Sequence, residues 1–340
     1  MNPSVNDPPI LDKINELIEL VGARSDEYEG ELAAQVIQTA LKLLLDKTDL
    51  GQMKLMTRAL KEMRYAYRTF SRYPVTRRVS IFGSARTPEA HPDYQAALRF
   101  SHLMATSGWA CMTGGADGIM KAGLQGVEQD QRFGLSILLP WEAGSNTLID
   151  KDPKLMMFRY FFTRKLMFVS HSDAFAAFPG GLGTMDELFE VLTLMQTGKA
   201  EIMPLVLIEG NERAYWKSWE DYVKDHLLAN GWISPKDTTL YYMAKSPEDA
   251  RDHILKFYSN YNSSRYVKDR FVIRLNKEPR AQDLKSLSKE FASLIEKGEL
   301  EKTARYPEES DVPDLPRVSF IHTRKDFSRM RELINKFNEL

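Results

Sequence analysis

"DAFAAFPGGLGTMDELFEVLTLMQ", residues 173–196, passes from an apolar run through three closely spaced glycines into a helical pattern. The apolar run is typical of a buried parallel strand, and glycines at the turn allow backbone N–H groups to approach an anion closely. The helix that follows directs the positive end of its dipole to the same point. The stretch therefore predicts a strand, a phosphate-binding turn and a helix.

The same alternation of strand and helix extends over residues 76–257. Further apolar strands are expected in "RRVSIFGSA", "WACMTGG", "FGLSILLP" and "IMPLVLIEG", with helices between them. Continuous apolar strands separated by helices predict a Rossmann-like α/β domain with a doubly wound parallel sheet. Ligands bind such sheets at the carboxyl ends of the strands. Three of the expected strands end there in small-residue turns, which contain Gly83 and Ser84, Gly114 and Gly115, and Gly180 and Gly181.

Two flanking parts have different patterns. Residues 1–75 show apolar residues at helical spacing, which predicts an N-terminal helical extension. Basic and aromatic residues interleave in "KEMRYAYRTFSRY", which favours a packing or oligomer face over a nucleic-acid surface. Residues 258–340 open with the polar connector "YSNYNSSR", followed by a strand, a helix over about 281–297, an acidic loop, a second strand and a terminal helix. They predict either a small α+β module or an extension of the main sheet.

The composition is that of an ordinary globular protein. The formal net charge is -1, and 43% of residues are hydrophobic. We therefore expect neither nucleic acid nor a membrane as a partner, because no global charge or long apolar run favours them. The N-terminus lacks a signal-peptide pattern, and the single cysteine, Cys111, is compatible with a reducing compartment, so a cytoplasmic location is expected. No cluster has metal-ligand spacing, and we expect no metal.

Two glycine turns carry the predicted phosphate site. In "PGGLGTMDE", Gly180, Gly181 and Gly183 form the turn, and the Thr184 hydroxyl is placed to donate to a phosphate oxygen. The spacing from Thr184 to Glu187 also fits a capping box, in which both residues only cap their own helix. A second turn, "TGGADGIMKAG", repeats the pattern at Gly114 and Gly115. Neither turn is a P-loop or a dinucleotide fingerprint, and such compact turns suit a single phosphate group.

A basic pair, Arg164 and Lys165, lies in the mostly apolar segment "MFRYFFTRKLMFVSHSD". An unpaired charge in such surroundings is costly, so the pair needs an acidic partner. A substrate phosphate or a carboxylate such as Glu187 would serve, and an ordinary salt bridge within the chain is the alternative.

These segments together resemble the LOG family, the cytokinin riboside 5′-monophosphate phosphoribohydrolases and their bacterial relatives. "PGGLGTMDE" matches the family signature PGGxGTxxE, and "FGSA", "TGGADGIM", "LPWEAGSN" and "LMQTGK" resemble family segments in the family order. The resemblance covers about residues 78–257. "TRK" is similar to the end of the family's M-H-E-R-K motif, but Phe162 and Thr163 replace its His-Glu. Members have also been called lysine decarboxylases, but the sequence offers no evident lysine site for pyridoxal phosphate.

The resemblance implies hydrolysis of the N-glycosidic bond of a nucleoside 5′-monophosphate, of the AMP or cytokinin riboside type, without a cofactor. Glu187 would stabilise the oxocarbenium-like transition state and orient water, while Arg164 would hold Glu187 or the substrate. The glycine turns, Ser84, Thr184 and Lys165 would bind the phosphate. Ribose or base contacts are assigned to Asp117, Trp141 and Asn146. For Asp117 a role in stabilising the turn, and for Trp141 a place in the core, are the alternatives.

Two further expectations concern assembly and activity. The resemblance implies a homodimer or a larger homo-oligomer. The alternative to an enzyme is a nucleotide-binding carrier or regulatory protein on the same fold, without catalysis. A third hypothesis makes residues 258–340 a sensor that modulates the site.

Overall fold

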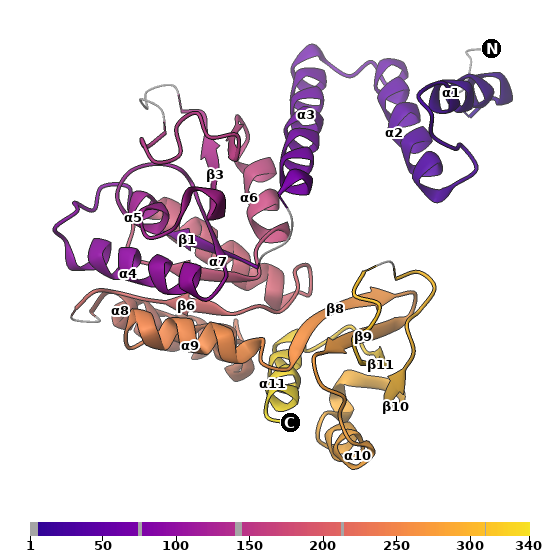
Figure 1. Ribbon diagram of the computed structural model, residues 1–340. Coiled ribbons are helices and arrows are strands. Elements are labelled where there is room, and N and C mark those ends of the chain that lie inside the picture. Colours follow the sequence, from indigo (N-terminus) through magenta and orange to yellow (C-terminus); the bar gives the residue numbers. More distant parts are fainter. Residues whose placement is uncertain (1–5, 74–76, 140–144, 212–213, 310) are drawn as a thin grey trace. The chain divides into compact units, whose positions relative to one another are not determined.

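The computed structural model describes residues 6–73, 77–139, 145–211, 214–309 and 311–340 of the chain (Figure 1). The chain divides into two compact units, Met1–Arg64 and Tyr65–Leu340. No helix in the described ranges is long and apolar enough to cross a membrane.

The first unit is helical, as the sequence predicts. It contains α1 (Pro8–Leu20), α2 (Tyr28–Leu45) and the first part of α3 (Leu50–Arg72). Prolines occupy the first two positions of α1, where a backbone N–H is not needed. Ile14 and Ile18 of α1 are buried, and α1 packs against α2.

The second unit is built on a seven-stranded sheet whose neighbouring strands are all parallel. Its order is β4-β3-β2-β1-β5-β6-β7, so the chain reverses direction across the sheet between β1 and β5, and this point is its topological switch point. The predicted Rossmann-like sheet is therefore confirmed. The strands are β1 (Arg78–Phe82), β2 (Ala110–Thr113), β3 (Arg132–Ile137), β4 (Leu155–Phe158), β5 (Ala174–Ala177), β6 (Leu205–Leu207) and β7 (Tyr242–Met243).

Helices follow most of these strands. A core of buried apolar residues, including Val79, Phe100 and Ile254, joins the sheet to α4 and α9. Cys111 is fully buried in this core, and burial raises the pKa of its thiol, as expected of a small hydrophobic residue. The helices are α4 (Pro92–Thr106), α5 (Ile119–Gln125), α6 (Phe161–Ser170), α7 (Leu182–Gln196), α8 (Ala214–Tyr222), which continues as a π-helical stretch over Val223–Leu228, and α9 (Pro247–Phe257).

The C-terminal part forms its own four-stranded antiparallel sheet, in the order β10-β11-β9-β8. It is thus an α+β module and not an extension of the main sheet. Tyr258 joins the two parts, because its hydroxyl donates to the Asp173 carbonyl at 2.6 Å and the Arg77 guanidinium lies over its ring. The elements are β8 (Tyr261–Val267), β9 (Arg270–Leu275), α10 (Ala281–Glu290), β10 (Ile295–Thr303), β11 (Arg317–His322) and α11 (Phe327–Asn338).

Two expectations for this part were wrong. The polar connector "YSNYNSSR" contributes to β8, because its backbone pairs with β9 and its polar side chains are tolerated at the edge of the sheet. The expected helix over 281–297 ends at Glu290, and residues 295–303 form the charged edge strand β10 instead. The predicted division at residues 75 and 257 stays a prediction, since residues 258–340 share a compact unit with the sheet.

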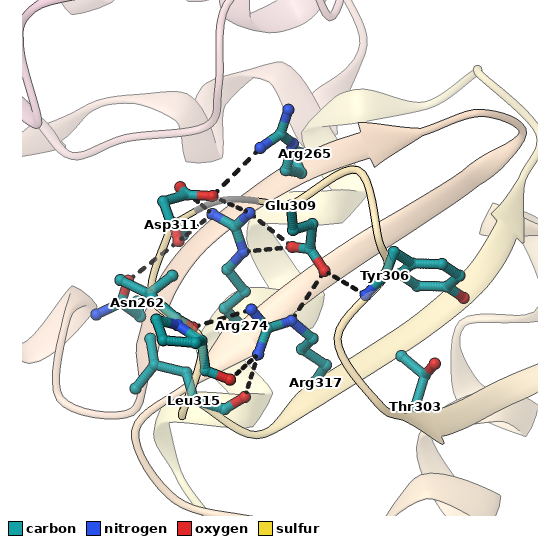
Figure 2. Close-up of polar contacts among 12 residues, drawn as sticks. Asn262, Arg265, Arg274, Thr303, Tyr306, Glu309, Asp311, Leu315 and Arg317 are labelled. Atoms are coloured by element: carbon teal, nitrogen blue, oxygen red, sulfur yellow. Dashed lines mark hydrogen bonds and ion pairs between the residues drawn. The ribbon is translucent and has the colours of Figure 1, made fainter.

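A buried ion-pair network attaches the acidic segment before β11 to this sheet (Figure 2). The Glu309 carboxylate accepts hydrogen bonds from Arg274 at 2.6 Å and 2.9 Å and from Arg317 at 2.9 Å. Burial raises the pKa of Glu309, but the hydrogen bonds from Arg274, Tyr306 and Arg317 outweigh it and hold the pKa below its ordinary value. Asp311 adds a second pair of contacts to Arg274. The network therefore fixes the segment by charge rather than by apolar packing.

Candidate active site

A cleft of about 620 Å³ lies at the carboxyl edge of the parallel sheet, where β1 and β5 are neighbours. It is lined by the turns after β1 and β2, by the end of β3, and by α6 and the start of α7. The lining residues are Phe82, Gly83, Ser84, Ala85, Arg86, Gly114, Ala116, Met120, Ser136, Ile137, Leu139, Phe161, Arg164, Phe168, Gly181, Leu182, Gly183, Thr184 and Glu187.

The turns after β1 and β5 are joined by backbone hydrogen bonds. The Ser84 N–H donates to the Pro179 carbonyl at 3.1 Å, and the Ser84 carbonyl accepts from Ile119 at 3.0 Å. This close approach requires glycine at position 180. A Cβ there would lie 2.1 Å from the Thr184 Oγ1 and 2.9 Å from the Ser84 nitrogen. Gly180 is therefore needed by the packing of the chain itself.

Gly181 and Gly183 have different surroundings. A Cβ at either position would have no heavy atom within 4 Å, and both residues line the cleft. Neither has a positive φ. The fold therefore does not require glycine at these two positions, but the missing side chains leave the backbone open to a ligand.

The first turn of α7 faces this opening. Gly181 is the N-cap of the helix and has no side chain that could cap it. Thr184 lies in the first turn and Glu187 in the second, so the capping-box alternative does not apply. The first N–H groups of a helix have no partner within it, and the dipole favours an anion there.

Glu187 and Arg164 meet across the cleft. The Arg164 Nη2 donates to the Glu187 Oε1 at 3.0 Å, and both side chains are largely buried. The Arg164 guanidinium also lies 5.0 Å from the centre of the Phe161 ring. Burial raises the pKa of Glu187 above its ordinary value, and the charges of Arg164 and Lys165 oppose this only in part. A carboxyl group with a raised pKa beside a guanidinium suits general acid–base chemistry.

Lys165 lies outside the cleft lining. Its ammonium forms an ion pair with Asp186 at 2.7 Å and a second with Glu190. Burial lowers the pKa of Lys165, but the hydrogen bonds to Asp186 and Glu190 raise it above its ordinary value. Lys165 thus forms the intrachain salt bridge that was the alternative to a phosphate contact.

Two of the three predicted ribose or base contacts, Asn146 and Asp117, do not line the cleft. The buried Asn146 amide donates to the carbonyls of Gly115 and Ala116, at 3.0 Å and 2.8 Å, and so supports the turn after β2. Asp117 is exposed and does not line the cleft. Trp141 lies outside the described residues. Gly115, predicted to bind the phosphate, does not line the cleft, and its backbone N–H donates to the Thr113 hydroxyl.

Sequence reasoning missed several residues of the cleft. Arg86 is exposed at its edge, and its backbone N–H donates to the Ser84 Oγ at 3.1 Å. Arg86 directly follows the small-residue turn "GSA" after the first strand of the domain, and this position could have indicated a place at the cleft. Phe161, Phe168 and Met120 supply an apolar wall, which only the folded chain brings together. Within the described ranges, no group of three or more His, Cys, Asp or Glu side chains is placed to hold a metal ion.

Comparison with known proteins supports the resemblance seen in the sequence. Residues 112–254 match the family model described as "Possible lysine decarboxylase". A cytokinin riboside 5′-monophosphate phosphoribohydrolase of Rhodococcoides fascians is 37% identical over 87 residues, which are 26% of this chain and 42% of the relative. An Arabidopsis thaliana protein of the same name is 34% identical over 126 residues, 36% of this chain and 55% of the relative. The chain thus spans about half the length of these relatives.

Solved structures of similar topology include two proteins concerned with the molybdenum cofactor. The molybdenum cofactor carrier protein of Chlamydomonas reinhardtii is 18% identical, with a TM-score of 0.39, over 54% of this chain and 98% of that one. The molybdenum cofactor binding protein of Rippkaea orientalis is 21% identical, with a TM-score of 0.37, over 53% and 96%.

Proposed function

From the resemblance to the LOG family, which the comparisons support over residues 112–254, we propose that this chain hydrolyses the N-glycosidic bond of a nucleoside 5′-monophosphate. The products are the free base and ribose 5-phosphate. The observation that carries the proposal is the buried Glu187–Arg164 pair, in one cleft with the open backbone of Gly181 and Gly183.

The cleft provides separate places for the parts of such a substrate. The phosphate binds at the start of α7, against Gly181 and Gly183, with the hydroxyls of Ser84 and Thr184 as donors. Arg86 adds a positive charge at the edge. The apolar wall accepts the flat face of the base. A volume of about 620 Å³ lies within the range of about 300–1,000 Å³ that is usual for small-molecule sites.

The reaction needs one water molecule and no cofactor. The bond between C1′ and the base nitrogen breaks, and its electron pair leaves with the base, which takes up a proton from solvent water. The water oxygen bonds to C1′ and gives a proton to the Glu187 carboxylate, which releases it to solvent after the reaction. The same carboxylate stabilises the positive charge that develops on the sugar. Arg164 orients this carboxylate through the 3.0 Å hydrogen bond. Binding of the distant phosphate holds C1′ against Glu187, which raises the rate.

Product release from a set of nucleotides tests the proposal. The purified chain is incubated with AMP, GMP, CMP, UMP and a prenylated adenosine monophosphate, each beside its nucleoside, and base and ribose 5-phosphate are followed by chromatography. We expect release from at least one monophosphate and none from its nucleoside. Tight binding of a monophosphate without release would contradict the hydrolase and favour a nucleotide-binding carrier or regulatory protein.

A further inference from the structure

Large apolar side chains are exposed along the three N-terminal helices. On α1 and α2 they include Leu20 and Leu44, which are 81% and 62% exposed, together with Leu17, Leu32 and Val36. On α3 the exposed apolar residues of the first unit are Leu50, Leu55, Met56 and Leu60. α6 also exposes Phe161, Phe162 and Leu166, of which Phe161 lines the cleft described above.

These side chains form stripes and not isolated points. Leu32, Val36 and Leu44 lie on α2 at separations of four and eight residues, which brings them to one side of the helix. Met56 and Leu60 are likewise one turn apart on α3. An apolar stripe of this kind normally packs against another element.

The two stripes lie among charges of opposite sign. Residues 8–45, which contain α1 and α2, carry seven acidic and three basic residues. Residues 50–64 of α3 carry four basic residues and one acidic residue. Glu16 and Glu19 flank Leu17 and Leu20, and Lys61 and Arg64 flank Leu60. Apolar surfaces with opposite charges at their edges are complementary to each other.

We propose that these helices bind a second copy of this chain, with the acidic α1–α2 surface of each copy packed on the basic α3 surface of the other. Each chain carries both surfaces, so a two-fold pair forms the same contact twice and is closed. The exchange covers both apolar stripes at once. The partner is therefore another molecule of this protein.

Charge reversal on the full-length chain tests this pairing. The variant Lys61→Glu/Arg64→Glu makes residues 50–64 net acidic, like the α1–α2 surface. The variant Glu16→Lys/Glu19→Lys makes α1 net basic and leaves residues 8–45 without net charge. Lysines near the C-terminal end of α1 interact favourably with the negative end of the helix dipole, so the second variant should keep this helix. Molar mass is measured by sedimentation equilibrium for the wild type, for each variant and for their equimolar mixture, against a chain mass of 39.0 kDa. Circular dichroism checks that the helices are retained.

We expect each variant alone to associate more weakly than the wild type, by on the order of tenfold or more in the dissociation constant. The mixture should regain the wild-type mass, because acidic α1–α2 then meets basic α3 in one contact, and the basic α1 meets acidic α3 in the other. A monomeric wild type, or variants with unchanged mass, would overturn the proposal. Variants that dissociate but do not pair with each other would also overturn it, since the two surfaces would then not face one another.

Discussion

Substitution of Gly183 by alanine should separate ligand binding from stability. A Cβ at this position has no neighbour within 4 Å, and it lies in the first turn of α7 without a positive φ. Alanine is preferred to glycine in a helix, so the free energy of unfolding should stay equal or rise by up to about 1 kcal/mol. The new methyl group occupies cleft space where we place the phosphate. Overpacking of that kind costs about 1–3 kcal/mol, which corresponds to a loss of roughly 5- to 150-fold in nucleotide affinity.

Gly180→Ala is the matched comparison, because its Cβ would meet the Thr184 Oγ1 at 2.1 Å. We expect this variant to lose about 1–3 kcal/mol of stability. The assays are urea unfolding for stability and calorimetric titration with the best nucleoside 5′-monophosphate for affinity. A Gly183→Ala protein that binds the nucleotide as tightly as the wild type would refute the placement of the phosphate.

Three further predictions concern charged and titrating groups. The acid limb of kcat/KM should lie at a higher pH than an ordinary glutamate would give, because burial raises the pKa of Glu187 and activity falls as this base is protonated. Arg164→Gln should move this limb to still higher pH, since it removes the opposing charge. Burial lowers the pKa of His171 to about 4, so the unfolded chain binds a proton at this residue more readily than the folded one. The resulting contribution to stability, of order 2–3 kcal/mol, is present above about pH 6.5 and is lost as the pH falls towards 4. In His171→Phe, the free energy of unfolding measured in urea should therefore depend less on pH over this range. Glu309→Gln leaves the buried Arg317 without a carboxylate and leaves Arg274 with Asp311 alone, and it should cost about 3–5 kcal/mol, measured by thermal and urea unfolding.

Each of these has a contrary result. An acid limb that does not move in Arg164→Gln would show that Glu187 does not set it. An unchanged pH slope in His171→Phe would mean that other groups carry the acid sensitivity. Full stability of Glu309→Gln would show that the network of the C-terminal sheet is dispensable, and Glu308→Gln, whose partner Lys268 is exposed, is the control expected to change little.

The main sheet was predictable because its signals are local. The apolar run before Pro179 and the glycines after it mark a strand and a turn without knowledge of the rest of the chain. The edge strands β8 and β10 were not predictable in this way. Their residues are polar or charged, and they become strands only through pairing with β9 and β11. Propensity carries little information where long-range pairing decides the structure.

The candidate site shows the same division. The motif residues Glu187 and Arg164 are 23 positions apart in the sequence and form a hydrogen bond in the structure, and their catalytic roles stay predictions. Arg86 and the residues of the apolar wall belong to no sequence motif, so only the fold reveals them. Asn146 looked like a ligand contact because of its neighbours in sequence, but it bonds to the turn 31 positions away. Lys165 was assigned to the phosphate, and its acidic partners lie one helix further along the chain.

The most direct test of the account is the turnover of Glu187→Gln beside Glu190→Gln. Both acids lie on α7 within one turn of each other, but only Glu187 lines the cleft. With the nucleoside 5′-monophosphate that the wild type cleaves, we predict that Glu187→Gln loses about 10²- to 10⁴-fold in kcat while it still binds the nucleotide. Glu190→Gln should stay within about threefold of the wild type, because Glu190 does not line the cleft and its direct contact is the ion pair with Lys165. Equal activity of the two variants would contradict the central claim that Glu187 acts on the glycosidic bond.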